Sequence, residues 1–161
     1  MKNDLIAGRL ALVAASAFAS ACAYINAVEQ PARLDLEPRA LLAQWARSYK
    51  RGTVMQVSLA VAAAGLGGAS FARTRDRRWL GGAALLLALL PYTLLGVLPT
   101  NRRLLRLLAT PAGDDDEAVR GGVRRWGRLH AVRTGLGIAA ALTFVWASLP
   151  ADGEPYGPAS Q

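Results

Sequence analysis

Apolar residues are gathered into four long runs along the chain, at about 5–27, 54–72, 79–98 and 129–149. Each run is close to the ~20 residues that an α-helix needs to cross the hydrocarbon core of a bilayer. Charged residues stand in blocks between the runs. The pattern predicts an all-α integral membrane four-helix bundle, formed by one domain over residues 1–150. The Pro- and Gly-rich residues 151–161 are expected to be a flexible C-terminal tail.

Small residues recur at every fourth position in three of the runs, a spacing that places them on one helix face. Such rows let helices approach each other closely in lipid. The rows are Ala11, Ala15, Ala19, Ala23 and Ala27 in the first run, Ala60, Ala64, Gly68 and Ala72 in the second, and Ala131, Gly135, Ala139, Thr143 and Ala147 in the fourth. We expect these faces to form the contacts between helices.

Prolines mark the predicted ends and bends of the spans. Pro31 and Pro99 are expected to end the first and third spans, and Pro91 to kink the third, because proline lacks the N–H of the helical ladder. Residues 38–49 and 102–108 have amphipathic spacing. The sequence therefore predicts short amphipathic helices in the loops between spans 1–2 and 3–4.

The first run has an alternative interpretation as a cleaved secretory signal. Lys2 and Arg9 precede an apolar core, and Ala17-Phe18-Ala19 has the form of a cleavage site. Three further spans follow, and the row of small residues continues past the cut. These two features favour a retained first span.

Composition supports a membrane protein and narrows the classes of function. Of the 161 residues, 53% are hydrophobic and 19% charged, and the formal net charge is +8. The basic residues flank the apolar runs as membrane anchors, so no nucleic-acid partner is predicted. Cys22 is the only cysteine and His130 the only histidine, so we predict no metal site. We expect membrane lipid as a partner and the bacterial inner (plasma) membrane as the location, and a homo-oligomer is left open.

The alternating direction of four spans brings the ends of the first and third beside the starts of the second and fourth. That side gathers acid, amide, imidazole and aromatic groups: Glu29, Gln30, Tyr49, Gln56, Thr100, Asn101, Trp126, His130 and Arg133. The opposite side has no comparable mixture. We predict a pocket at this end of the bundle. The alternative is that these residues are ordinary anchors at the membrane interface.

The start of the fourth run holds the best candidate within this set. Trp126, His130, Arg133 and Thr134 share one face of a helix because they are three and four residues apart. An ionised arginine costs roughly 2.5–3.5 kcal/mol at the centre of a bilayer, and less near its boundary, where it can snorkel. A histidine and an arginine one turn apart at the mouth of an apolar helix indicate a functional pair.

Four sequence pieces carry a resemblance to a known family. They are VEQPARL (28–34), WARSYKRGTVMQ (45–56), PYT followed by LPTNRRL (91–93 and 98–104), and WGRLHAVRT (126–134). In this order, between four apolar runs, they resemble the anthrone-oxygenase-like family of small integral membrane proteins, much of which is known only as a domain of unknown function. The resemblance covers about residues 5–149. It implies oxidation of anthrones to anthraquinones with O₂, in aromatic polyketide pathways and with no cofactor, although many bacterial members have no assigned reaction.

The resemblance carries Asn101, Trp126, His130 and Arg133 over as motif positions, and extends to Glu29. The implied reaction needs a base, for which a histidine titrates in a suitable range. His130 is the expected base, and Glu29 would orient it or replace it. Arg133 and Asn101 would donate hydrogen bonds to the oxyanion that develops on the substrate. These four residues are the predicted catalytic set.

The implied partners are O₂ and a flat aromatic, anthrone-like or phenolic substrate. Its rings would stack on aromatic side chains. The expected substrate-binding residues are Trp126, Tyr92, Thr100, Gln56 and Tyr49.

The sequence leaves open whether the chain is an enzyme. One alternative is a non-catalytic four-helix membrane protein that binds a lipid, quinone or partner subunit. The other is a transporter or channel component, although no span carries the several charges of a relay.

Overall fold

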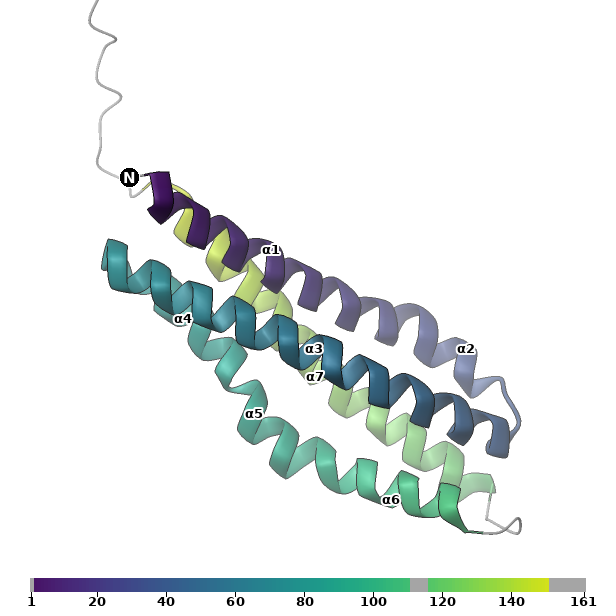
Figure 1. Ribbon diagram of the computed structural model, residues 1–161. Coiled ribbons are helices and arrows are strands. Elements are labelled where there is room, and N and C mark those ends of the chain that lie inside the picture. The colour runs from purple at the N-terminus through teal and green to yellow at the C-terminus, as the bar shows by residue number, and fades with distance from the viewer. Residues whose placement is uncertain (1, 111–115, 151–161) are drawn as a thin grey trace, which may run out of the picture.

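The computed structural model describes residues 2–110 and 116–150 as a bundle of four long helices (Figure 1). All four are long and apolar enough to cross a membrane, and no strand occurs within the described ranges. The prediction of an all-α membrane bundle is confirmed. The tail predicted at 151–161 lies outside the described residues.

Each long helix runs in the opposite direction to the one before it (Figure 1). The first consists of α1 (Lys2–Tyr24), η1 (Ile25–Glu29) and α2 (Gln30–Leu34), and the second is α3 (Pro38–Thr74). The third consists of α4 (Arg77–Leu87), α5 (Leu89–Tyr92), η2 (Thr93–Val97) and α6 (Leu98–Ala109), and the fourth is α7 (Asp116–Ser148). Helices α1 and α4 each pack against both α3 and α7. The first span is therefore part of the bundle.

The two amphipathic segments do not form separate short helices, contrary to expectation. Residues 38–49 are continuous with the apolar part of α3, and residues 102–108 belong to α6. Their apolar sides are buried inside the protein, where Leu41, Trp45 and Leu104 join one hydrophobic cluster with Trp126. Burial against neighbouring helices extends the bundle beyond the predicted spans.

Pro31 and Pro99 do not end their helices. The prediction that they would end the first and third spans is therefore wrong. Each follows a five-residue π-helical turn, η1 before Pro31 and η2 before Pro99. In η1 the N–H of Gln30 donates to the carbonyl of Ile25, five residues back, and Leu98 makes the corresponding bond in η2. The wider turn relieves the clash that a proline ring makes with the preceding turn, and the helix continues.

The third long helix is interrupted near Pro91, as predicted. Its regular part α4 ends at Leu87, and α5 begins after Ala88. Since a proline has no N–H, Pro91 cannot donate to the carbonyl four residues earlier, which is that of Leu87. The helix accordingly changes direction between α4 and α6 (Figure 1).

Large aromatic side chains fit against glycines in the middle of the bundle. Phe144 of α7 lies against Gly67 of α3 and Gly82 of α4, and a Cβ added at Gly67 would lie 2.7 Å from the Phe144 ring. Phe18 of α1 fits against Gly137 of α7 in the same way. Absence of a side chain at these positions brings the helices into close contact.

The predicted small-residue rows agree with the structure over most of the first span and disagree at the start of the fourth. Ala11, Ala15 and Ala19 are buried in α1, as expected. In α7, however, Ala131 and Gly135 are exposed. Of this row Ala147 is buried, and the buried face of α7 otherwise follows Gly137, Ala140 and Phe144. Burial of the large Phe144 ring favours a rotation of α7 that turns Ala131 and Gly135 outward.

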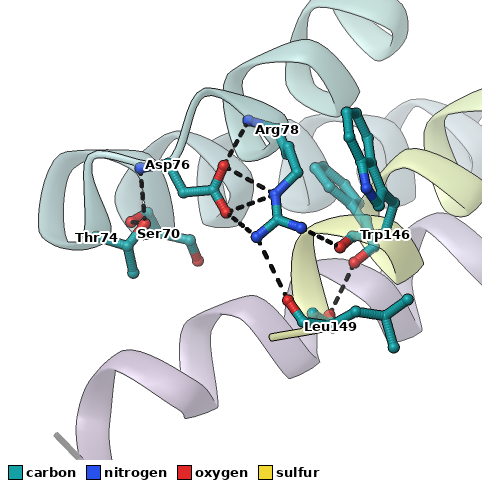
Figure 2. Close-up of polar contacts among 8 residues, drawn as sticks. Ser70, Thr74, Asp76, Arg78, Trp146 and Leu149 are labelled. Carbon is teal, nitrogen blue, oxygen red and sulfur yellow. Dashed lines mark hydrogen bonds and ion pairs between the residues drawn. The ribbon is translucent and has the colours of Figure 1, made fainter. Parts of the chain in front are cut away.

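A polar network joins the α3–α4 turn to the end of α7 (Figure 2). Asp76 caps α4 by accepting from the N–H of Arg78, at 2.9 Å. The Arg78 guanidinium pairs with the Asp76 carboxylate and donates to the carbonyls of Trp146 and Leu149. The hydrogen bond from the Arg78 side chain holds the pKa of Asp76 below its ordinary value. These contacts hold the α3–α4 turn against the end of α7. We call this end of the bundle the turn end.

Candidate functional site

A small chamber with polar lining residues lies toward the opposite end of the bundle, between all four long helices. Its lining residues are Ile25, Glu29, Arg33, Ser48, Tyr49, Gly52, Thr53, Gln56, Val97, Asn101, Trp126, His130 and Arg133. Seven of these belong to the predicted site set, namely Glu29, Tyr49, Gln56, Asn101, Trp126, His130 and Arg133. We call this space the inner chamber.

His130 is held by Asn26, a residue of the π-helical turn η1. The Asn26 side-chain amide donates to the carbonyl of Gly127 at 3.0 Å, so its Oδ1 is the atom that faces His130. That oxygen accepts from the Thr134 hydroxyl at 2.7 Å and lies 2.8 Å from Nδ1 of His130. Because Oδ1 can only accept, Nδ1 must carry the proton in this contact.

The other ring nitrogen of His130, Nε2, has no hydrogen-bond partner among the described residues. In the neutral imidazole that Asn26 selects, this nitrogen carries the lone pair and can accept a proton. His130 is 1% exposed overall and lines the inner chamber. The geometry thus presents one basic nitrogen in a site sheltered from bulk water.

Glu29 does not contact His130, although the sequence suggested that it would orient the imidazole. Its Oε1 accepts from Ser48, from Gln44 at 3.0 Å and from the guanidinium of Arg33 at 2.6 Å. Asn26 takes the orienting position instead. Glu29 lines the chamber beside His130 and neutralises one of the two guanidinium groups there.

Aromatic rings and a guanidinium stack on one wall of the chamber. The Arg33 guanidinium lies over the Trp126 ring, 5.4 Å from its centroid. Trp126 in turn stacks on the His130 ring, with centroids 4.9 Å apart, and meets Trp45 edge-on. This packing fixes the plane of the imidazole in addition to the hydrogen bond from its Nδ1.

Arg133 reaches across the chamber and donates to Oε1 of Gln56 at 2.9 Å. Several buried polar atoms around it have no hydrogen-bond partner within the described part of the chain. Those on chamber-lining residues are Arg33 Nε and Nη1, Gln56 Nε2, Asn101 Oδ1, Trp126 Nε1 and Arg133 Nε. All but the Asn101 oxygen are donors. Buried donors without partners are costly, so their clustering around a cavity indicates a binding site for a ligand with acceptor oxygens.

Tyr92 and Thr100 of the predicted substrate-binding set do not line the inner chamber. The Tyr92 hydroxyl donates to the carbonyl of Leu129 at 2.9 Å, and Thr100 is buried within α6. Conversely, the sequence did not single out Asn26 and Arg33 as site residues. Asn26 lies near the end of the first apolar run and Arg33 shortly after it, and the chain around the π-helical turn η1 places both beside α7.

A second, larger and less polar cavity adjoins the inner chamber. The two spaces share the lining residues Tyr49, Thr53, Gln56, Asn101 and Arg133. We call this space the side cavity. Within the described ranges, no group of three or more histidine, cysteine, aspartate or glutamate side chains is placed to hold a metal ion.

The family model described as anthrone oxygenase matches residues 45–143. The chain belongs to the anthrone oxygenase family. It is 38% identical over 131 residues to an anthrone oxygenase of Claviceps purpurea, a match that covers 73% of this chain and 74% of the relative. It is also 35% identical over 117 residues to the anthrone oxygenase tpcL of Aspergillus fumigatus, covering 68% and 73%. No solved structure gives a significant match.

These anthrone oxygenases come from fungi, and a third relative is the anthrone oxygenase dmxR16 of Cryptosporiopsis, 32% identical over 133 residues, covering 77% of this chain and 78% of the relative. They therefore give no support to the bacterial inner membrane expected from the sequence. The matched residues 45–143 include α7 from its start to beyond Arg133, and the part of α3 that carries Tyr49 and Gln56. The family relationship thus extends over most of the inner chamber.

Proposed function

We propose that this member of the anthrone oxygenase family oxidises an anthrone-like or phenolic substrate with O₂ in the inner chamber. The observation that carries the proposal is the pairing of one basic nitrogen without a hydrogen-bond partner, Nε2 of His130, with buried donors that also lack partners among the described residues. A base and a set of donors are the two elements needed to deprotonate a carbon that is conjugated to a carbonyl.

His130 is the proposed base. The methylene carbon opposite the carbonyl of an anthrone is acidic because the carbanion is delocalised into that carbonyl as an aromatic phenolate. Nε2 takes the methylene proton, while Nδ1 keeps its proton on Asn26 Oδ1, 2.8 Å away. Asn26 and the Trp126 stack act as positioning groups, because they fix the ring without touching the reacting carbon.

Arg133 and its neighbours are proposed to hold the oxyanion. The chamber contains the two guanidinium groups of Arg33 and Arg133 and one carboxylate, that of Glu29, so its charge is positive when the imidazole is neutral. Arg133 Nε and Gln56 Nε2 have no hydrogen-bond partner in the part of the chain that the structure describes. An oxyanion that formed against them would satisfy these donors and offset the positive charge.

The reaction balances without a further reductant or oxidant. The substrate anion passes its electrons to O₂, and the two combine at the same carbon to give a hydroperoxide. Loss of water from this intermediate leaves a second carbonyl. Overall, one CH₂ group and one O₂ give one C=O group and one H₂O, so the proton first taken by His130 leaves in the water.

The proposal is tested with purified protein in lipid nanodiscs, incubated with anthrone and O₂. Quinone absorbance and O₂ consumption are followed together, and empty nanodiscs give the spontaneous rate. We expect one O₂ consumed per quinone formed. The variant His130→Gln is expected to lower turnover roughly 10²–10⁴-fold. Arg128→Gln, an exposed position on the same helix outside the chamber, is the control and should keep wild-type turnover.

Two results would contradict the proposal in different ways. A wild-type rate equal to that of empty nanodiscs would remove the enzyme activity for this substrate class and favour a lipid- or quinone-binding protein. Wild-type turnover in His130→Gln would remove the role of His130 as base and leave the oxygenase activity standing.

A further inference from the structure

The side cavity opens on the flank of the bundle and not at either of its ends. Its rim is formed by Val57 and Val61 of α3 on one wall and by Leu87 and Leu90 on the facing wall, and these four side chains are 46–59% exposed. All four lie inside the apolar parts of two membrane-length helices. The mouth therefore faces the hydrocarbon of a bilayer, where only apolar molecules are concentrated.

The interruption of the third long helix at Ala88 accounts for the opening. On the side toward the turn end, Gly67 of α3 and Gly82 of α4 meet closely around Phe144. On the side toward the inner chamber, the third helix changes direction, and the small side chain of Ala60 in α3 lines the resulting gap. The break thus converts a tight helix contact into an open cavity on the flank of the bundle.

The side cavity leads to the proposed reaction centre. Its inner wall is formed by Gln56, Asn101 and Arg133, which also line the inner chamber beside His130. Polarity therefore increases from a leucine- and valine-lined mouth to a wall with unpartnered amide and guanidinium atoms. This gradient suits a ligand with an apolar, flat body and acceptor oxygens at one edge.

We propose that the side cavity is the binding site and lateral entrance for a neutral, flat polycyclic phenol or ketone that reaches the protein from within the bilayer. The body of the ligand lies between α3 and α4–α5, and its oxygens accept hydrogen bonds from Arg133 and Gln56 at the inner wall. The inference rests on the proposed function for the identity of the ligand, and it adds the route and the site at which the rings are held.

The test uses a binding probe that does not depend on turnover. The probe is 1,8-dihydroxyanthraquinone, titrated against the protein in nanodiscs of a neutral phospholipid. Ala60→Trp fills the cavity from α3, whereas Ala62→Trp adds the same ring at an exposed position two residues away that does not line it. We expect the Kd to rise at least tenfold for Ala60→Trp and to stay at the wild-type value for Ala62→Trp.

A second pair of variants keeps the test valid if Ala60→Trp fails to fold. Leu90→Trp narrows the mouth from the facing wall, and Leu95→Trp is its control, because Leu95 is 80% exposed and lies outside the cavity. The lateral route is tested with anthraquinone-2-sulfonate, which has the same rings and a permanent charge. We expect it to bind at least tenfold more weakly than the neutral probe.

The outcomes separate this inference from the proposed function. Tight probe binding that Ala60→Trp and Leu90→Trp weaken, in a protein that does not oxidise anthrone, would support the cavity and overturn the oxygenase proposal. Normal anthrone oxidation and normal probe binding in both filled variants would support the oxygenase proposal and overturn the side cavity as the binding site. Equal affinity for the sulfonate would overturn the bilayer route. An acyl chain bound so firmly that no probe binds would show that the cavity holds lipid, and would overturn the inference.

Discussion

The turn end and the inner chamber both contain buried or half-buried arginines, and they use them differently. At the turn end, the Arg78 guanidinium bonds to the Asp76 carboxylate and to two carbonyls that end α7 (Figure 2). In the inner chamber, Arg133 has one partner, Gln56, and its Nε has none within the described chain. Arg78 thus joins two parts of the fold, whereas Arg133 keeps a hydrogen-bond donor available for a ligand.

Packing follows the same division. Between the turn end and the middle of the bundle, glycines receive aromatic rings and the helices touch. Around the chamber, the helices carry two adjoining cavities. Interiors are normally close-packed, and their polar groups are normally paired. Departures from both rules in one region, and from neither at the turn end, indicate where this protein binds a ligand.

The largest expected contrast comes from the same substitution made at both ends. Arg133→Lys keeps a positive charge but loses the planar set of donors. We expect turnover in the anthrone assay to fall about 10²–10³-fold, the usual effect of losing an oxyanion donor. Arg78→Lys should leave turnover unchanged and lower only the melting temperature. Equal activity in the two variants would mean that Arg133, like Arg78, is structural.

A smaller effect is expected at Asn26, which holds the imidazole without facing the substrate. Asn26→Leu has similar size and no acceptor for the Nδ1 proton. The proton can then sit on either ring nitrogen, and we expect kcat to fall about 10–100-fold, as for other groups that orient a functional histidine. KM should change little, because the chamber wall is intact. A rise in KM with constant kcat would instead assign Asn26 to substrate binding.

The spans and the end of the bundle that carries the chamber were predictable from the sequence, because both depend on the length and alternation of apolar runs. The roles of Asn26 and Arg33 were not. The π-helical turns relieve the clash between a proline ring and the carbonyls of the preceding turn. Neither the composition of the chain nor its hydrophobic periodicity indicates such a turn. Glu29 was expected near His130 and lines the same chamber, yet its hydrogen bonds go to Ser48, Gln44 and Arg33.

The face of the fourth span was mispredicted for a related reason. Ala131 and Gly135, at the start of the predicted row, have the spacing of a helix contact but face outward. Burial of the Phe144 ring gains more free energy than burial of the Ala131 methyl group, which favours the rotation of α7 that buries Phe144. The same rotation turns His130 inward, which leaves it 1% exposed. Packing of one large residue thus places the proposed base.

Close packing near the turn end gives the third prediction. Gly82→Ala would place a methyl group against Phe144, and we expect a loss of about 1–3 kcal/mol in stability, typical of an overpacked core. Gly81→Ala is the control, because a Cβ there lies 3.7 Å from Thr143, an ordinary contact. Thermal unfolding in detergent measures both. If the two variants melt alike, Phe144 has room to move and the fit is looser than described.

The smallest predicted effect is a pH dependence at the turn end. The folded protein lowers the pKa of Asp76 through the hydrogen bond from Arg78, so the resulting stability is present above the ordinary pKa of an aspartate. It is lost as the pH falls through the lower pKa of the folded state. The difference in stability between wild type and Asp76→Asn should be below about 1 kcal/mol near neutral pH and should shrink in acid. A difference that grew in acid would contradict this assignment.

The two π-helical turns also act as one-residue insertions in otherwise regular helices. Each residue of an α-helix advances the rotation by about 100°. Deleting one residue from η1 would restore the regular ladder before Pro31 and rotate everything on its N-terminal side relative to Arg33. Phe18, which now fits against Gly137, would then leave its position, although no residue of that contact had been changed. The register of the whole first helix is therefore set by a single wide turn.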